Sequence, residues 1–238
     1  MKVMLLAAGK GERMLPLTAT TPKPLLQAGG ITLIEHQIRK LAANGLRDIV
    51  INHAWLGAQI EAALGDGSAL GVSIQWSRET EPLETAGGIV RALPLLGNEP
   101  FAVANADIWT EFPFHTLHDA LRPEDLVHLV LVENPEHHRA GDFNLSVDGR
   151  LRQDLDSPRH TYAGIGVFHP HLFAGMTDGK APLLPCLRRA IALGRASGEI
   201  FDGDWIDVGT PERLARLDER LRQDGGAYAG ASISNQNG

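Results

Sequence analysis

Residues 5–25, LLAAGKGERMLPLTATTPKPL, decide the fold of this chain of 238 residues. The stretch starts inside an apolar run, Val3 to Leu6, that predicts a buried strand. Small residues and glycines follow, so backbone N–H groups there can approach an anion closely, and glycine reaches positive φ without steric penalty. A strand that leads directly into such a loop predicts a binding site for phosphate groups.

The charges of the same loop support this prediction. Lys10, Arg13 and Lys23 stand against one carboxylate, Glu12, although the whole chain has a formal net charge of −7. Such a local reversal of charge predicts an anionic ligand. Lys23 also lies between two prolines, whose fixed φ and whose restriction of the preceding residue predict an extended, rigid backbone for that lysine.

Two known kinds of phosphate loop do not fit the spacing. A dinucleotide fingerprint needs a third glycine where Met14 stands, and an acidic residue after the second strand, where Asn52 stands. A P-loop ends in Gly-Lys-Ser or Gly-Lys-Thr, and no such tripeptide follows this loop. The sequence therefore predicts a third kind of phosphate site.

Composition sets broad limits on the class of protein. Hydrophobic residues make up 43% of the chain and charged residues 21%, as in ordinary globular proteins. The acidic balance argues against nucleic acid as a partner, because no basic stripe is present to neutralise a phosphate backbone. No stretch approaches the roughly 20 apolar residues of a membrane span, no signal-peptide pattern opens the chain, and the single cysteine, Cys186, excludes an internal disulfide. We therefore expect a soluble cytoplasmic protein with no nucleic acid and no membrane as partner, in which Cys186 is a buried, inert thiol.

Strands and helices alternate in the first half of the chain. Apolar periodicity predicts strands over residues 3–6, 48–52, 72–76 and 101–105, and helices over residues 33–42, 58–64 and 86–93. This order predicts an α/β fold with a Rossmann-like, mostly parallel sheet flanked by helices, in which ligands bind at the carboxyl ends of the strands. The loop, Asn52 and Asp107 lie at such ends.

The second half of the chain is richer in strands. Strands are predicted over residues 127–132 and 162–168, a hairpin over 142–153 with its turn at Asp148-Gly149, and short strand segments over 199–205. Helices are predicted over 183–193 and 211–221, the second with Thr210 as its N-cap. This part predicts a smaller β-rich insertion that faces the substrate, and residues 225–238, which are small and polar, predict a disordered tail.

The run L-A-A-G-x-G-x-R-M-x-P-L-T-x-x-x-P-K-P-L, at residues 6–25, resembles the signature of sugar-1-phosphate nucleotidyltransferases. The resemblance implies a nucleotide-diphospho-sugar transferase fold in one domain, residues 1–222, with a nucleotide-binding part at about 1–110 and a sugar-binding part at about 111–205. It also implies Arg13 and Lys23 as catalytic residues, and nucleotide contacts from Ala7, Ala8, Gly9, Gly11, Glu12, Arg13 and Lys23.

Nucleotidyl transfer to a sugar phosphate needs no general base, because the attacking phosphate oxygen is already anionic near pH 7, with a second pKa of about 6. The reaction needs neutralised charge, in-line positioning and a divalent metal on the nucleotide phosphates. Arg13 can clamp phosphate oxygens bidentately, and Lys23 can lie near the α-phosphate as a point charge.

Two aspartates stand where composition predicts hydrophobic residues. Asp107, in A-N-A-D-I-W, follows a buried strand, and Asp207, in W-I-D-V-G-T, lies just before a turn. Mg²⁺ takes hard oxygen ligands, commonly one or two carboxylates together with substrate phosphates and water. The aspartates at the matching positions of the family hold Mg²⁺, so the resemblance implies Mg²⁺ at Asp107 and Asp207. The alternative for each is a turn or capping carboxylate.

Further positions match the family's substrate contacts. The segment Glu84-Thr85-Ala86-Gly87-Gly88 resembles the part that contacts the base and opens the third helix, so Glu84, Thr85 and Gly88 are candidates for nucleotide binding. Gly87 and Gly88 would let a planar ring approach, and the alternative is an ordinary helix N-terminus. Asn105, Gly141 and Gly164 match sugar or phosphate contacts.

Within the family, five segments of this chain are most similar to uridylyltransferases of peptidoglycan recycling, which join UTP to N-acetylmuramic acid α-1-phosphate. These segments are G-K-G-E-R-M, I-N-H-A-W-L, E-P-L-E-T-A-G-G-I, A-D-I-W-T and G-D-W-I-D-V-G-T. The other open functions are a thymidylyl-, guanylyl- or cytidylyltransferase, and a noncatalytic nucleotide-sugar-binding regulatory domain. The regulatory domain predicts loss of a key residue, and Arg13, Lys23, Asp107 and Asp207 are all present.

N-acetylmuramic acid differs from N-acetylglucosamine by a lactyl carboxylate. The candidates to pair with that charge are basic residues of the β-rich part, each of which is otherwise a solvated surface group: His137, His138, Arg139, Arg152 and Arg159. The position of Arg139 close to Gly141 predicts that it contributes more than Arg159.

Overall fold

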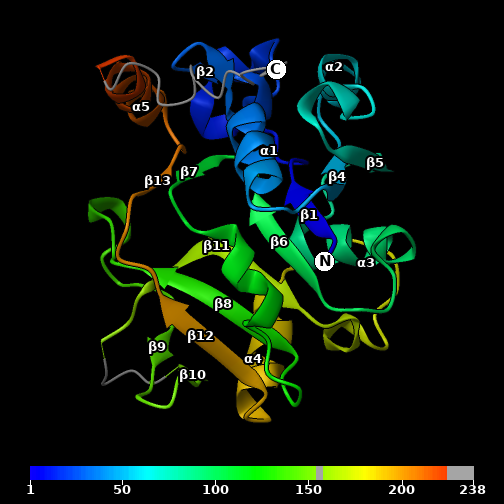
Figure 1. The fold of residues 1–238 in the computed structure, drawn as a ribbon, viewed down its shortest axis with the longest axis vertical. Helices are drawn as coiled ribbons and strands as arrows, with labels where there is room; N and C mark the ends of the chain where they lie inside the picture. Colours follow the sequence, from blue (N-terminus) through cyan, green and yellow to red (C-terminus); the bar gives the residue numbers. More distant parts are fainter. Residues whose placement is uncertain (154–157, 224–238) are drawn as a thin grey trace, which may run out of the picture.

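The computed structural model of the protein describes residues 1–153 and 158–223. A seven-stranded sheet runs through it (Figure 1), with its strands in the order β12-β8-β11-β6-β1-β4-β5. The strands, in chain order, are β1 (Val3–Leu6), β4 (Asp48–His53), β5 (Ser73–Arg78), β6 (Phe101–Asn105), β8 (Val127–Val132), β11 (Thr161–Phe168) and β12 (Ala196–Ile200). The tail predicted to be disordered, residues 225–238, lies outside the described residues.

Strand directions confirm the predicted α/β class. β1 is parallel to β4 and to β6, β4 is parallel to β5, and β8 is parallel to β12. β11 is inserted antiparallel between β6 and β8. The chain passes from β1 to β4 and β5 on one side and then returns to place β6 on the other side of β1, so the strand order reverses beside β1.

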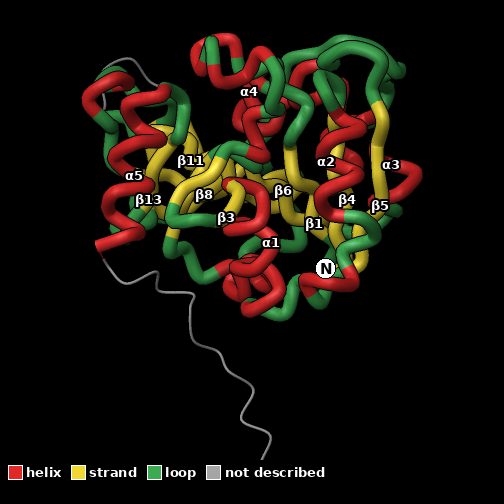
Figure 2. Tube along the Cα trace, turned by 90° about the horizontal axis from the view of Figure 1, so that it is seen from above, coloured by secondary structure: helices red, strands yellow, loops and turns green. Residues whose placement is uncertain are grey.

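Helices α1 (Leu33–Ala43), α2 (Gly57–Leu64), α3 (Glu84–Leu96) and α4 (Leu184–Ala192) cover the two faces of this sheet, and α5 (Pro211–Gln223) packs apart from it in a separate apolar cluster. Figure 2 shows α1 and α4 on opposite sides of the sheet. Alternate residues of β1 explain the two layers, since Val3 and Leu5 pack with α1 and α2, whereas Met4 packs with α3 and α4.

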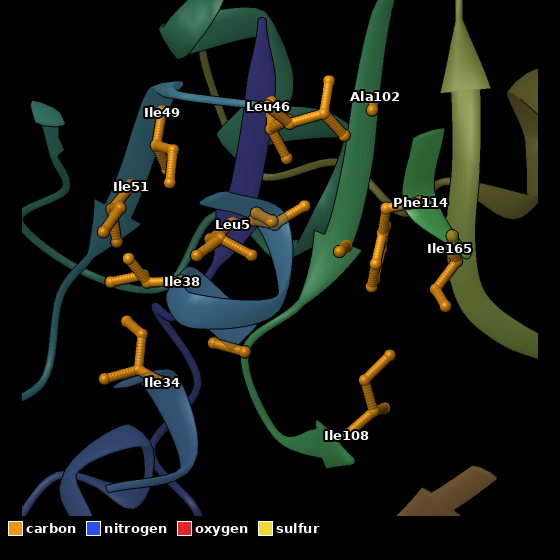
Figure 3. Packing of buried hydrophobic residues seen from close by; sticks show 14 of the residues in the cluster. Leu5, Ile34, Ile38, Leu46, Ile49, Ile51, Ala102, Ile108, Phe114 and Ile165 are labelled. Atoms are coloured by element: carbon orange, nitrogen blue, oxygen red, sulfur yellow. The ribbon is translucent and has the colours of Figure 1, made fainter. Parts of the chain in front are cut away.

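The core between β1 and α1 consists of branched aliphatic side chains. Leu5 lies against Ile34 and Ile38 of α1 and beside Ile49 and Ile51 of β4 (Figure 3), and all five are at most 1% exposed. α1 begins at an N-cap, Thr32, whose hydroxyl accepts a hydrogen bond from the Glu35 N–H. It ends before Gly45, which has φ of 81°, as the Asn-Gly pair predicts.

The β-rich part extends the main sheet. β11 pairs with β6, β8 with β11, and β12 with β8. The hairpin of β9 (Asn144–Leu145) and β10 (Leu151–Arg152) pairs antiparallel around the predicted turn, where Gly149 has φ of 78°. The strand segments predicted over 199–205 are shifted: β12 ends at Ile200, and the next strand is β13 (Trp205–Asp207). β13 pairs antiparallel with β7 (Ile108–Thr110), so its position depends on a contact distant in sequence.

A third apolar cluster joins the C-terminal helix to the first loop. Leu214, Leu217 and Leu221 of α5 pack with Met14 and Trp109. The backbone N–H of Gly29 donates to Asp218 of α5 at 2.8 Å, in the turn between β2 (Gln27–Ala28) and β3 (Ile31–Thr32). The C-terminal helix therefore packs against the loop that follows β1.

Short 3₁₀ turns complete the fold: η1 (Glu12–Met14), η2 (Leu17–Ala19), η3 (Lys23–Leu25), η4 (Ser68–Leu70), η5 (Phe114–Asp119), η6 (Glu136–His138) and η7 (Pro170–Phe173). Cys186 is buried in α4 as predicted, and burial raises the pKa of its thiol. In residues 1–153 and 158–223, no helix has the length and apolar character needed to cross a membrane.

Candidate active site

The carboxyl ends of β1 and β4 are tied together by buried hydrogen bonds. Asn52, in β4, accepts from the Ala7 N–H at 3.0 Å and donates to Glu79 Oε1 at 2.6 Å. The other oxygen of Glu79 accepts from the Leu83 N–H at 3.0 Å, just before α3. Burial raises the pKa of Glu79, because it disfavours the charged carboxylate more than the hydrogen bonds from Asn52 and Leu83 favour it. This network fixes the start of the loop relative to α3.

Glycines have two distinct roles in the loop. Gly11 has φ of 67°, and a Cβ at that position would lie 2.9 Å from Thr18 Cγ2. The Gly11 carbonyl also accepts from the Thr18 hydroxyl at 2.8 Å, which closes the turn. A Cβ at Gly9 would meet nothing within 4 Å, so Gly9 keeps open space on the cavity side of the loop.

Lys23 is rigid for a reason that differs from the prediction. Pro22 is extended, with ψ of 141°, but Lys23 begins the 3₁₀ turn η3 instead of continuing the extended segment. A proline fits the first turn of a helix because its missing N–H needs no partner there, so Pro24 is compatible with this turn. The Lys23 side chain is only 9% exposed, and its Nζ forms an ion pair with Asp107 Oδ2 at 2.5 Å.

Two neighbouring cavities lie at this edge of the sheet. The first, of about 560 Å³, is lined by six residues predicted to bind nucleotide: Ala7, Gly9, Gly11, Glu12, Arg13 and Lys23. The second, of about 350 Å³, is lined among others by Asn105, His137, His138, Trp205 and Asp207. Arg13 and Asp107 line both cavities, so the two spaces meet at these side chains.

Other predicted contacts do not line either cavity. Ala8 is buried in the loop. Glu84 and Thr85 begin α3, where Glu84 has φ of 61° and its carboxylate lies 3.7 Å from Lys180 Nζ. Lys180 itself lines the first cavity, so Glu84 reaches that cavity only through this lysine.

Glycine is needed at positions 87 and 88 for close packing within the protein, which differs from the predicted approach of a planar ring. A Cβ at Gly88 would lie 2.7 Å from Asn52 Nδ2, and one at Gly87 would lie 2.2 Å from the Gly179 carbonyl oxygen. Both glycines are buried, and they let α3 pack closely on the rest of the protein. Sequence could not show this, because the space is filled by residues from other elements.

Gly164 and Gly141 also act through packing. Gly164, in β11, has φ of 74°, and a Cβ there would lie 2.5 Å from Asn105 Nδ2. It therefore leaves room for the Asn105 side chain, which lines the second cavity. Gly141 has φ of 62°, and its missing Cβ leaves room for Asn134 and Arg159.

The two predicted metal ligands come together across the β7–β13 pair. The Val208 N–H donates to the Asp107 carbonyl at 3.0 Å, and Asp207 is opposite Ile108. Asp207 Oδ2 lies 2.6 Å from Arg213 Nη1 and 3.1 Å from His137 Nε2. The Asp107 and Asp207 side chains are 34% and 24% exposed, and both line the second cavity.

This pair of carboxylates fits Mg²⁺, which prefers hard oxygen ligands and accepts few of them from protein. Within the described residues, the hydrogen bonds of Asp107 and Asp207 use Oδ2, which leaves Oδ1 of each without a protein donor. Over the same residues no group of three or more His, Cys, Asp or Glu side chains is placed to enclose a metal.

Sequence reasoning missed several residues of the site. Arg213, in the first turn of α5, orients Asp207, and the Trp205 indole is held by a hydrogen bond from Nε1 to the Ala163 carbonyl at 2.9 Å. Glu79 supports Asn52 from inside the protein. The only feature of the sequence that indicated a role in the site for Arg213 and Trp205 was their closeness to Asp207 in the chain. No feature of the sequence indicated such a role for Glu79.

The nucleotidyl transferase family matches residues 2–224 of this sequence. The chain belongs to that family. This nucleotidyltransferase is 50% identical to N-acetylmuramate alpha-1-phosphate uridylyltransferase of Neisseria meningitidis serogroup B, over 90% of this chain and 95% of that protein. It is 35% identical to the protein of the same name from Caulobacter vibrioides, over 92% and 96% of the two chains.

Solved structures confirm the fold of this nucleotidyltransferase. A Bacillus anthracis protein crystallised in complex with sucrose superposes with a TM-score of 0.81 at 21% identity, over 93% of this chain and 95% of that chain. The mixed, mostly parallel sheet flanked by helices is therefore the architecture predicted from the loop and the β/α alternation.

Proposed function

We propose that this nucleotidyltransferase transfers the uridylyl group of UTP to N-acetylmuramic acid α-1-phosphate, giving UDP-N-acetylmuramic acid and pyrophosphate, with Mg²⁺ as cofactor. The observation that carries the proposal is the 50% identity to the Neisseria meningitidis protein of that name, which extends over nearly the whole of both chains. A cytoplasmic role in peptidoglycan recycling is part of the same proposal and rests on the sequence argument.

The first cavity suits the triphosphate of the nucleotide. Its wall is the glycine-containing loop, whose backbone can approach phosphate closely, and Lys10 and Arg13 add positive charge. Lys23 donates one hydrogen bond to Asp107, and an ammonium has three N–H groups, so two remain for phosphate oxygens. In the proposed reaction Lys23 stabilises the charge at the α-phosphate, and Arg13 holds phosphate where the two cavities meet.

The second cavity suits the sugar phosphate. Asn105 lies at the end of β6 near Asp107, and its amide can bind a phosphate or hydroxyl oxygen. Trp205 supplies an apolar wall for the sugar ring, because its polar N–H is already bonded to Ala163. No residue is needed as a base, since the attacking phosphate oxygen is anionic at neutral pH.

Asp107, which lines both cavities, and Asp207, which lines the second, would hold the metal. Bound Mg²⁺ would neutralise charge on the phosphates and orient them. The chain itself positions these carboxylates through Lys23 on one side and through Arg213 and His137 on the other.

The test is release of pyrophosphate from each of four nucleoside triphosphates with a panel of sugar 1-phosphates, with Mg²⁺ and with excess chelator. We expect UTP and N-acetylmuramic acid 1-phosphate to give the highest kcat/KM, and the chelator to abolish turnover. A clear preference for another nucleotide would assign a different transferase of the family. No turnover with any pair would favour a regulatory domain.

A further inference from the structure

Two consecutive histidines form a basic wall of the second cavity. His137 and His138 lie on η6, and both line this cavity. Their side chains are 41% and 39% exposed, so each can meet a ligand. The sugar substrates of this family bring a phosphate, which Arg13 and a metal held by Asp107 and Asp207 would meet, but a neutral sugar ring gives no reason for further basic side chains in the wall.

The two histidines have different acidic partners. His137 Nε2 lies 3.1 Å from Asp207 Oδ2, an oxygen that Arg213 also contacts. His138 Nε2 lies 3.0 Å from Asp142 Oδ1. His137 is therefore engaged with a proposed metal ligand, whereas His138 is independent of the metal pair.

The position of His138 is fixed through Asp142. Asp142 Oδ2 accepts the backbone N–H of Tyr162 at 2.8 Å, so the carboxylate is anchored to β11, the strand that lines the cavity floor. An imidazole bonded through Nε2 keeps Nδ1 for another partner. When protonated it donates from both nitrogens, so His138 can bridge Asp142 and the carboxylate of a ligand.

The arginine favoured by sequence does not occupy this place. Arg139 is exposed and is not part of the cavity wall, and its carbonyl accepts from Asn134 Nδ2 at 3.2 Å. Arg152 and Arg159 do not line the cavity either. Arg139 directly follows η6, whose His137 and His138 supply the lining of the cavity at this point.

We infer that His138, positioned by Asp142, binds the lactyl carboxylate of N-acetylmuramic acid 1-phosphate and makes the enzyme prefer this sugar to N-acetylglucosamine 1-phosphate. The inference rests on the proposed function and adds its specificity-determining residue. His138 is the basic side chain of the second cavity whose acidic partner is neither proposed metal ligand.

The test compares kcat/KM for three acceptors with saturating UTP: N-acetylmuramic acid 1-phosphate, its neutral lactyl amide, and N-acetylglucosamine 1-phosphate. The wild-type enzyme should use the acid at least about tenfold better than the amide, as expected for a charge-assisted hydrogen bond. In His138→Gln this ratio should fall to about one. Asp142→Asn should lower it partly, because His138 loses its anchor, and Arg139→Gln is the matched control and should keep the wild-type ratio.

The acid-to-amide ratio separates specificity from folding. A ratio that is unchanged in His138→Gln, or equal use of acid and amide by the wild type, would overturn the role of His138 while leaving uridylyl transfer to the acid intact. A loss of the same size on all three acceptors would also overturn it, because it would indicate a general structural role. If the wild type does not use N-acetylmuramic acid 1-phosphate at all, the proposed function fails together with this inference.

Discussion

The two cavities are built in opposite ways. The first is formed mainly by one continuous stretch, Leu6 to Pro24, whereas the second collects side chains from η6, β11, β13 and the segment after β6. A continuous loop carries its own conformation in its glycines and prolines, so its role can be inferred from sequence. A cavity assembled across the sheet depends on strand register, and a shift of one residue would turn its side chains to the other face.

The two cavities also differ in how their basic side chains are paired with acids. Within residues 1–153 and 158–223, Lys10 and Arg13 of the first cavity form no ion pair, whereas Lys23 and Lys180 of the same cavity pair with Asp107 and Glu84. Apart from Arg13, which lines both cavities, the basic groups near the second cavity are paired with acids: Arg213 and His137 with Asp207, and His138 with Asp142. We therefore expect the first cavity to attract polyanions in general, and the second to recognise charge at defined positions.

The largest expected effect is at the two carboxylates of the second cavity, Asp107 and Asp207. Asp107→Asn and Asp207→Asn should each lower kcat by about a hundredfold or more, because a bound metal contributes several kcal/mol of charge stabilisation. Pyrophosphate release at saturating substrates and Mg²⁺ measures the effect, and thermal unfolding checks that the fold is retained. Full activity in Asp207→Asn would remove this residue from the metal site.

The next effect separates the two cations of the loop. Lys23→Ala should lower kcat by about a hundredfold with little change in KM for UTP, since Lys23 would act mainly on charge formed at the α-phosphate. Arg13→Ala should change both kcat and KM, because Arg13 lines both cavities. Steady-state kinetics with varied UTP distinguish the two patterns, and an unchanged kcat in Lys23→Ala contradicts the role of Lys23.

A smaller effect is expected from the residue that orients Asp207. Arg213→Ala should raise the Mg²⁺ concentration for half-maximal activity by about tenfold, as groups that position metal ligands commonly do. Arg216→Ala, on an exposed position of the same helix, is the matched control. Equal Mg²⁺ dependence in both variants would show that Asp207 needs no support from α5.

Substitution of two glycines compares a position where an added Cβ would clash with one where it would meet no other atom. Gly164→Ala should lower the free energy of unfolding by about 1–3 kcal/mol, because a Cβ would collide with Asn105 at a left-handed φ. Gly9→Ala should change it by less than about 0.5 kcal/mol, since nothing lies within 4 Å, but should weaken UTP binding. Urea unfolding and KM for UTP measure the pair, and the opposite order of stabilities would refute this account.

The smallest effect concerns Glu79. Its pKa is raised by burial in the folded state, so the folded protein holds a proton that the unfolded chain has released. Its stabilising contribution is therefore present below the unfolded pKa and is lost as pH rises through the folded pKa. Unfolding free energies measured from pH 4 to pH 8 should decline more in the wild type than in Glu79→Gln, and parallel curves would contradict the burial argument.

Much of the fold could be predicted because the signals are local. The run Val3–Leu6, the Asn-Gly pair after α1 and the Asp-Gly turn of the hairpin each specify a backbone conformation without help from distant residues. The position of β13 could not be predicted in this way. Trp205–Asp207 has too few residues to show a periodicity, and its conformation is set by pairing with β7.

Sequence alone determined which chemistry this chain carries. The glycine loop with Arg13 and Lys23, followed far along the chain by Asp107 and Asp207, predicts a phosphate site with two carboxylates whatever the details of packing. Only the tertiary structure decided which side chains lie together: Gly88 faces Asn52, Arg213 orients Asp207, and His138, not Arg139, lines the second cavity. The physical reason is that the type of a residue determines which chemical groups it can contribute. Contact between side chains distant in sequence depends instead on strand register and helix packing.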